Sequence, residues 1–108
     1  MNDIDTRTFH FPDRVRDDDI RVVERAGNGS ILKAVITCNF DWQQHVELTV
    51  TPESLTIRLN VNGMDREYYD TDQESFLDAM AAAEQYLHST ELAVELDSMV
   101  DETSWLMS

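Results

Sequence analysis

The chain has few cysteines, glycines and prolines and no long apolar run. Among its 108 residues Cys38 is the single cysteine, which excludes an intramolecular disulfide and favours a reducing, cytoplasmic location. Three glycines and two prolines leave no linker-like segment, and no apolar run approaches the roughly 18 residues of a membrane helix. The first 20 residues also lack the apolar stretch of a signal peptide. We therefore expect a single compact, acidic α+β domain over residues 1–108 and no contact with a membrane.

Positive charge is scarce and unevenly distributed. The sequence has 22 acids and 8 bases, a formal net charge of -14, and Arg66 is its last base. From position 65 onward twelve acids face that one base, so this stretch alone has a net charge of -11. Such a surface repels nucleic acid, phospholipid and acidic ligands, and it attracts basic surfaces. The expected partner is therefore a basic protein, with no direct binding of nucleic acid.

Alternating apolar residues predict antiparallel strands in the middle of the chain. Residues 54–61 alternate in this way and are followed by Asn62 and Gly63, the two positive-φ positions of a type I′ hairpin turn. With a two-residue loop the returning strand, residues 64–69, places Glu67 opposite Arg58 as a cross-strand ion pair. This pattern fixes the register of the hairpin.

Three upstream segments extend the predicted sheet. Residues 45–50 alternate and join the hairpin through a turn at Pro52, so that both hairpins present apolar side chains to one face. Residues 30–38 are rich in β-branched side chains, and residues 20–25 form the preceding strand. A helix over residues 12–26 is an alternative for this last segment.

Helical periodicity replaces the strand pattern after the sheet. The first helix is indicated by five apolar residues, Phe76, Leu77, Met80, Ala83 and Leu87, and by a capping box of Thr71 and Glu74. The second, over residues 91–103, places four apolar residues on one face: Leu92, Leu96, Met99 and Val100. A strand over residues 92–96 is its alternative. The predicted fold class is α+β, a four- to five-stranded antiparallel β-meander with one or two C-terminal helices packed on one face.

The polar side of the second predicted helix opposes local stability. Glu91 and Glu95 form a like-charge pair four residues apart, as do Asp97 and Asp101, and each pair costs about 0.2–0.5 kcal/mol. Asp101 and Glu102 lie near the helix C-terminus, where the macrodipole disfavours anions. Uncompensated violations of this kind favour a binding surface, although a solvated face tolerated by packing is the alternative. The candidate partner-binding residues are Glu74, Asp78, Glu91, Glu95, Asp97, Asp101, Glu102 and Trp105.

The other residues that could bind a metal or take part in catalysis indicate no metal site and no cofactor. Asp17, Asp18 and Asp19 lack the spacing of a calcium loop, and the three histidines have no zinc-ligand spacing. A Cys38–His45 pair across the loop of residues 39–44 could form a nucleophile and its base. No third orienting group accompanies this pair, so we expect no catalytic residue.

Two aromatic clusters have alternative interpretations. One cluster is Phe40 and Trp42, and the other is Trp105, Leu106 and Met107. Each cluster is either part of the core or an anchor at an interface.

The sequence as a whole predicts a non-enzymatic inhibitor that binds the basic nucleic-acid-binding surface of a larger protein. In size, charge and predicted architecture the chain is similar to phage counter-defence proteins, such as anti-CRISPRs and DNA mimics, and to immunity proteins of nuclease toxins. No stretch of sequence identifies a family. The alternative is an acidic structural or interaction domain of a salt-adapted organism, for which Lys33, the single lysine among seven arginines, is the supporting feature.

Overall fold

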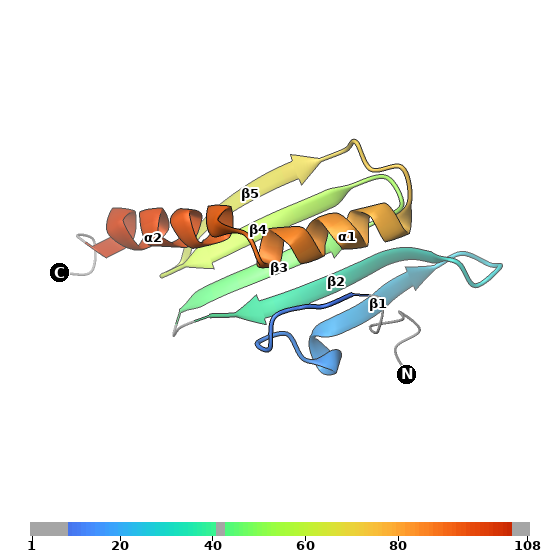
Figure 1. The fold of residues 1–108 in the computed structure, drawn as a ribbon, viewed down its shortest axis with the longest axis horizontal. Helices are drawn as coiled ribbons and strands as arrows, with labels where there is room; N and C mark the ends of the chain where they lie inside the picture. Colours follow the sequence, from blue (N-terminus) through green and yellow to red (C-terminus); the bar gives the residue numbers. More distant parts are fainter. Residues whose placement is uncertain (1–8, 41–42, 105–108) are drawn as a thin grey trace.

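A computed structural model, in which residues 9–40 and 43–104 are described, contains a five-stranded sheet followed by two helices (Figure 1). The strands are antiparallel and lie side by side in sequence order. Their bounds are β1 Ile20–Arg25, β2 Ile31–Asn39, β3 Gln44–Val50, β4 Leu55–Val61 and β5 Met64–Asp70. The helices are α1, Phe76–Leu87, and α2, Thr90–Ser104. The predicted α+β meander with C-terminal helices is therefore confirmed.

The β4–β5 hairpin has the predicted turn and register. Asn62 has a φ of 53° and Gly63 a φ of 89°, as a type I′ turn requires. Arg58 lies opposite Glu67, and its Nε is 3.7 Å from a carboxylate oxygen of that residue. Its Nη2 is closer to Asp65, at 3.3 Å, a diagonal pair that the register alone did not predict. The turn therefore fixes which side chains of β4 and β5 share a face.

The segment with two sequence interpretations forms a strand. A 3-10 turn, η1 at Asp17–Asp19, leads directly into β1, so the helical alternative for residues 12–26 is wrong. Pairing of β1 with β2 is irregular on either side of Glu24, which indicates bulges in this strand. β1 and β5 are the two edges of the sheet.

The core lies between one face of the sheet and a layer made of three segments. Helix α1 lies over β3 and β4, and α2 continues along β4 (Figure 1). Because the two helices run end to end in a single row, they leave the apolar face of β1 and β2 uncovered. Phe9, Phe11 and Val15 of the N-terminal segment pack against the core there. The fully buried side chains include Ile36, Leu48, Leu59, Met80 and Met99.

Helix α1 begins later than the sequence pattern predicts. Its N-cap is Ser75, whose Oγ accepts a hydrogen bond from the backbone N–H of Asp78 at 3.1 Å, so the Thr71 capping box is wrong. Leu77 is 63% exposed because it lies about 100° around the helix from Phe76, outside the apolar stripe. Phe76 itself is partly buried against the core. Among the described residues, no helix is long and apolar enough to cross a membrane.

Candidate protein-interaction surface

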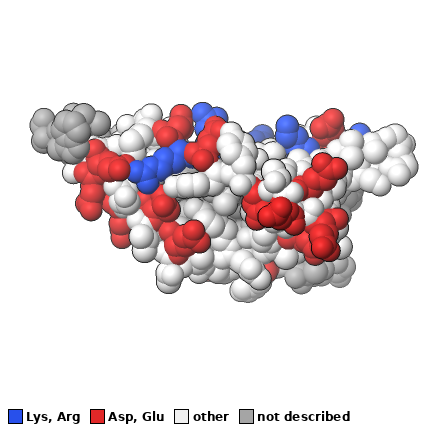
Figure 2. Space-filling model, turned by 90° about the horizontal axis from the view of Figure 1, so that it is seen from above, with Lys and Arg blue, Asp and Glu red and all other residues white. Residues whose placement is uncertain are grey.

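The two helices carry acids and, in the described residues, no base. The acidic residues are Asp78 and Glu84 on α1 and Glu91, Glu95, Asp97, Asp101 and Glu102 on α2. The described bases lie on the strands and on the segment before them: Arg14, Arg16, Arg21, Arg25, Lys33, Arg58 and Arg66. In Figure 2, which views the β5 edge, acids predominate on the visible face, and most of the bases seen there lie near its upper border. The helical layer is thus the most uniformly acidic part of the described structure.

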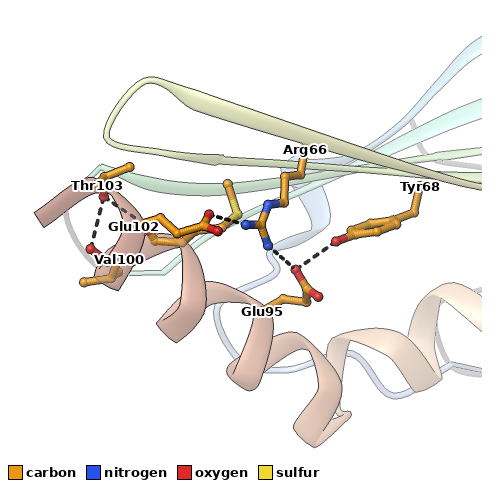
Figure 3. A network of polar contacts seen from close by, with 7 residues as sticks. Arg66, Tyr68, Glu95, Val100, Glu102 and Thr103 are labelled. Carbon is orange, nitrogen blue, oxygen red and sulfur yellow. Dashed lines mark hydrogen bonds and ion pairs between the residues drawn. The ribbon is translucent and has the colours of Figure 1, made fainter. Parts of the chain in front are cut away.

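Arg66 on β5 holds two of the α2 acids, which we call the inner flank: Glu95 and Glu102 (Figure 3). Its Nη1 is 2.9 Å from Glu95 Oε2, and its Nη2 pairs with Glu102. Tyr68, also on β5, donates its hydroxyl proton to the same Glu95 oxygen at 2.8 Å. These hydrogen bonds with Glu95 raise the pKa of both Arg66 and Tyr68 above their ordinary values.

A second contact ties the end of α2 to the hairpin turn. Asn62 donates from Nδ2 to the Thr103 hydroxyl at 2.9 Å, and that hydroxyl donates to the Met99 carbonyl at 2.8 Å. Thr103 is buried, so these bonds satisfy a polar group inside the packing. The expectation that the α2 acids have no compensation is therefore wrong for Glu95 and Glu102, because Arg66 pairs with both and offsets one of their two negative charges.

The other α2 acids remain unpaired, and two of them, Asp97 and Asp101, form what we call the outer flank. Both are exposed and have no hydrogen bond or ion pair from their carboxylates to any described residue. Asp97 lies two residues beyond Glu95, about 200° around the helix, and so on the side away from Arg66. Glu91 is also exposed and unpaired among the described residues. These three carboxylates are available to a partner.

The remaining sequence candidates are dispersed. Glu74 is exposed in the bend before α1, and Asp78 occupies the first turn of that helix. An anion there interacts favourably with the helix macrodipole, which gives Asp78 a structural role. Trp105 lies outside the described residues, as does Trp42. The structure therefore groups the α2 acids and separates them from Glu74 and Asp78 by the length of α1 (Figure 1).

A cavity of about 440 Å³ lies where the two helices meet the β4–β5 hairpin. Its apolar lining includes Leu55 and Ile57, which are buried, and Tyr68 and Tyr86 also line it. The acids at the cavity are Asp70, Glu91 and Glu95. Sequence reasoning missed this site because the residues come from four elements and share no local pattern.

Tyr86 contributes an unpartnered polar atom to this region. Its hydroxyl oxygen has less than 1 Å² of exposed surface and no hydrogen-bond partner among the described residues. Burial raises the pKa of Tyr86 to about 12, and the negative charges of Glu95 and Glu91 act in the same direction. A buried hydroxyl without a partner costs free energy, because it has lost its bonds to water.

The hypothetical Cys38–His45 pair does not form. Cys38 lies opposite Val46 and is buried in the core, whereas His45 lies opposite Asn39 and is exposed on the other face. The His45 ring is 2.6 Å from the Asn39 side-chain oxygen. Burial raises the pKa of Cys38, which disfavours the thiolate that a nucleophile needs.

The other candidates have structural contacts. The Asp19 carboxylate accepts a hydrogen bond from the Arg16 backbone N–H at 3.0 Å. Phe40 is partly buried against the core, and the Arg14 guanidinium lies 5.3 Å from its ring centroid. No group of His, Cys, Asp and Glu in the described residues has the arrangement of a metal site.

Comparison with known proteins adds no information on function. No protein family, no curated protein and no solved structure matches the chain. The function is therefore argued from the surface itself. That surface combines unpaired carboxylates on α2, contacts of α2 with Arg66 and Asn62 of the hairpin, and a cavity at the start of the helix.

Proposed function

We propose that the protein is a small inhibitor whose acidic α2 surface occupies the basic nucleic-acid-binding site of a larger protein in the cytoplasm. This class of inhibitors includes phage counter-defence proteins of the anti-CRISPR or DNA-mimic type. It also includes immunity proteins of nuclease toxins. The observation that carries the proposal is the segregation of charge. Seven acids and no base stand on the two helices, in a chain with a formal net charge of -14.

The proposed action is competition and requires no catalytic residue. Carboxylates on a fixed helix substitute for phosphates and pair with Lys and Arg of the partner. While they do so, nucleic acid cannot release its counterions at that surface, which is a main source of its affinity. The Arg66 contacts and the Asn62–Thr103 bond hold α2 against the sheet, which reduces the entropy that binding would have to remove.

The structure indicates which acids to reverse in a test. Reversal of Glu95 or Glu102 would place a cation beside Arg66 and disturb the fold, so these two acids should stay. Asp97→Lys with Asp101→Lys changes only the outer flank. A matched control, Asp13→Lys with Asp18→Lys, makes the same change of net charge at exposed positions before the sheet.

The experiment captures a partner with the immobilised full chain from a lysate of the cells in which the protein functions. The captured protein is then assayed for nucleic-acid binding. We expect one equivalent of wild-type chain or of the control variant to abolish that binding, and the outer-flank variant to leave it intact. A captured protein that still binds nucleic acid in excess chain would contradict the proposal. A mobility shift of nucleic acid by the chain alone would do so too.

A further inference from the structure

We propose that the cavity between α1, α2 and the β4–β5 hairpin receives an arginine side chain of the basic partner protein. The arginine stem would lie on the apolar lining, and its guanidinium would meet Glu91 and Glu95. This inference rests on the proposed function, because it identifies one anchor for the cationic partner. Its test needs no partner, so the two proposals can fail separately.

The size and lining of the cavity suit an amphipathic side chain. Its volume of about 440 Å³ falls within the usual range for ligand sites, roughly 300–1,000 Å³. Leu55 and Ile57 are buried and provide apolar surface. Arginine buries its three methylene groups on such surface while its charged end reaches polar groups.

Two aromatic rings and two carboxylates surround the space that the guanidinium would occupy. Tyr68 and Tyr86 both line the cavity, and a guanidinium stacks on aromatic faces more readily than an ammonium does. Glu91 is unpaired among the described residues and stands one helical turn before Glu95. A planar cation with several N–H donors can reach both carboxylates at once.

Glu95 is already oriented for a further donor. Arg66 and Tyr68 both bond to its Oε2, and Oε1 has no hydrogen-bond partner among the described residues. Figure 3 shows the second oxygen directed away from Arg66. Fixing one oxygen lowers the entropic cost of binding through the other, which favours a cationic guest at this position.

The Tyr86 hydroxyl favours a guest that donates hydrogen bonds. It is an oxygen acceptor beside the cavity with no donor among the described residues. Less than 1 Å² of its surface is accessible, so a guest reaches it only when the ring or its neighbours move. An apolar guest would supply no donor to this oxygen, to Glu91 or to the second oxygen of Glu95, whereas arginine supplies five N–H groups.

The test is an NMR titration of the full chain with N-acetyl-arginine methylamide, whose blocked ends imitate a residue within a protein. We expect chemical-shift changes that map to Leu55, Ile57 and Ala82 at millimolar probe. N-acetyl-citrulline methylamide has nearly the same shape without the charge and should cause no such changes. Free L-arginine has the same net charge, but its ammonium and carboxylate would have to lose water on entering the site, so it should bind no more tightly than the blocked probe. Tighter binding of free L-arginine would indicate a small-molecule site and overturn the proposal.

Two variants with the same change of charge complete the test. Glu91→Gln should weaken probe binding about tenfold, the loss expected for one charge-assisted hydrogen bond. Asp97→Asn, on the outer flank, should leave probe binding unchanged. Equal weakening by both variants would show only general attraction to an acidic protein. That result, an absence of cavity shifts, or equal shifts with citrulline would each overturn the proposal while leaving the competition experiment unaffected.

Discussion

The inner and outer flanks of α2 carry the same kind of charge in opposite situations. Glu95 and Glu102 contact Arg66, and the Glu95 side chain is only 28% exposed. Asp97 and Asp101 are exposed on the other side of the helix without a described partner. The comparison shows that part of the acidic surplus holds the helix to the sheet and part does not. Only the second part needs a functional explanation.

The largest effect that separates the flanks should come from Arg66→Gln. Without the guanidinium, Glu95 and Glu102 would stay close together beside β5 with no counter-charge. We expect the melting temperature to fall by several degrees Celsius, measured by circular dichroism. The matched change Asp101→Asn should leave it almost unchanged. Equal melting temperatures for the two variants would mean that Arg66 does not hold α2 and that the flanks are equivalent.

Tyr86→Phe should have a smaller effect of the opposite sign. The substitution removes a buried hydroxyl that has no described partner and keeps the ring, so we expect a stabilisation of about 1 kcal/mol in urea denaturation at neutral pH. Tyr68→Phe is the control, since its hydroxyl donates to Glu95 and its loss should destabilise the fold. A destabilised Tyr86→Phe variant would show that the hydroxyl has a partner in solution.

Alkaline pH provides a second test of the same residue. The pKa of Tyr86 is raised from 10.0 to about 12, so the folded state holds the phenolic proton after the unfolded state has released it. This contribution to stability is complete below pH 10 and is lost as pH rises from 10 through 12. The melting temperature of the wild type should therefore fall more steeply between pH 10 and pH 12 than that of Tyr86→Phe. An equal fall of the two melting temperatures would contradict the raised pKa of Tyr86.

The smallest stability change is expected on the outer flank. Asp97→Lys with Asp101→Lys replaces one repulsive pair by another, so stability should change by no more than a few tenths of a kcal/mol. Under the proposed function partner binding should nevertheless be lost, which the capture experiment measures; a variant that still binds the partner would show that this flank is not the binding surface.

Salt dependence distinguishes this view from adaptation to a saline cell. At about 0.01 M salt the Debye length reaches roughly 30 Å, and acids spread over a whole surface would repel one another. We expect the wild type to keep its circular dichroism spectrum between about 0.01 M and 1 M salt. Unfolding at the lower concentration would favour the salt-adaptation alternative.

The β4–β5 hairpin could be predicted in detail because its determinants are local. Asn62 and Gly63 select the turn, the turn selects the register, and the register places Arg58 opposite Glu67. The start of α1 was misplaced because Thr71 and Ser75 both have a suitable acid three residues on, and the local pattern does not choose between them. The packing of Phe9 and its neighbours had no periodic signal at all.

The site could be predicted only in composition. The acids of α2 are visible in the sequence, but their division into flanks depends on where α2 lies against β5, which is a tertiary property. Arg66 and Glu95 are 29 residues apart, and nothing in either segment indicates that they meet. The cavity at Tyr86 is likewise hidden, because its walls come from both helices and both strands of the hairpin.

The two edges of the sheet resist polymerisation by different means. At β1 the bulges beside Glu24 interrupt the row of backbone groups that another strand would need. β5 pairs regularly with β4, so its outer edge depends on the negative charges of Asp65, Glu67 and Asp70 to keep a second chain away. A strand of acids along an open edge thus protects the chain from pairing with its own copies, whatever other protein it binds.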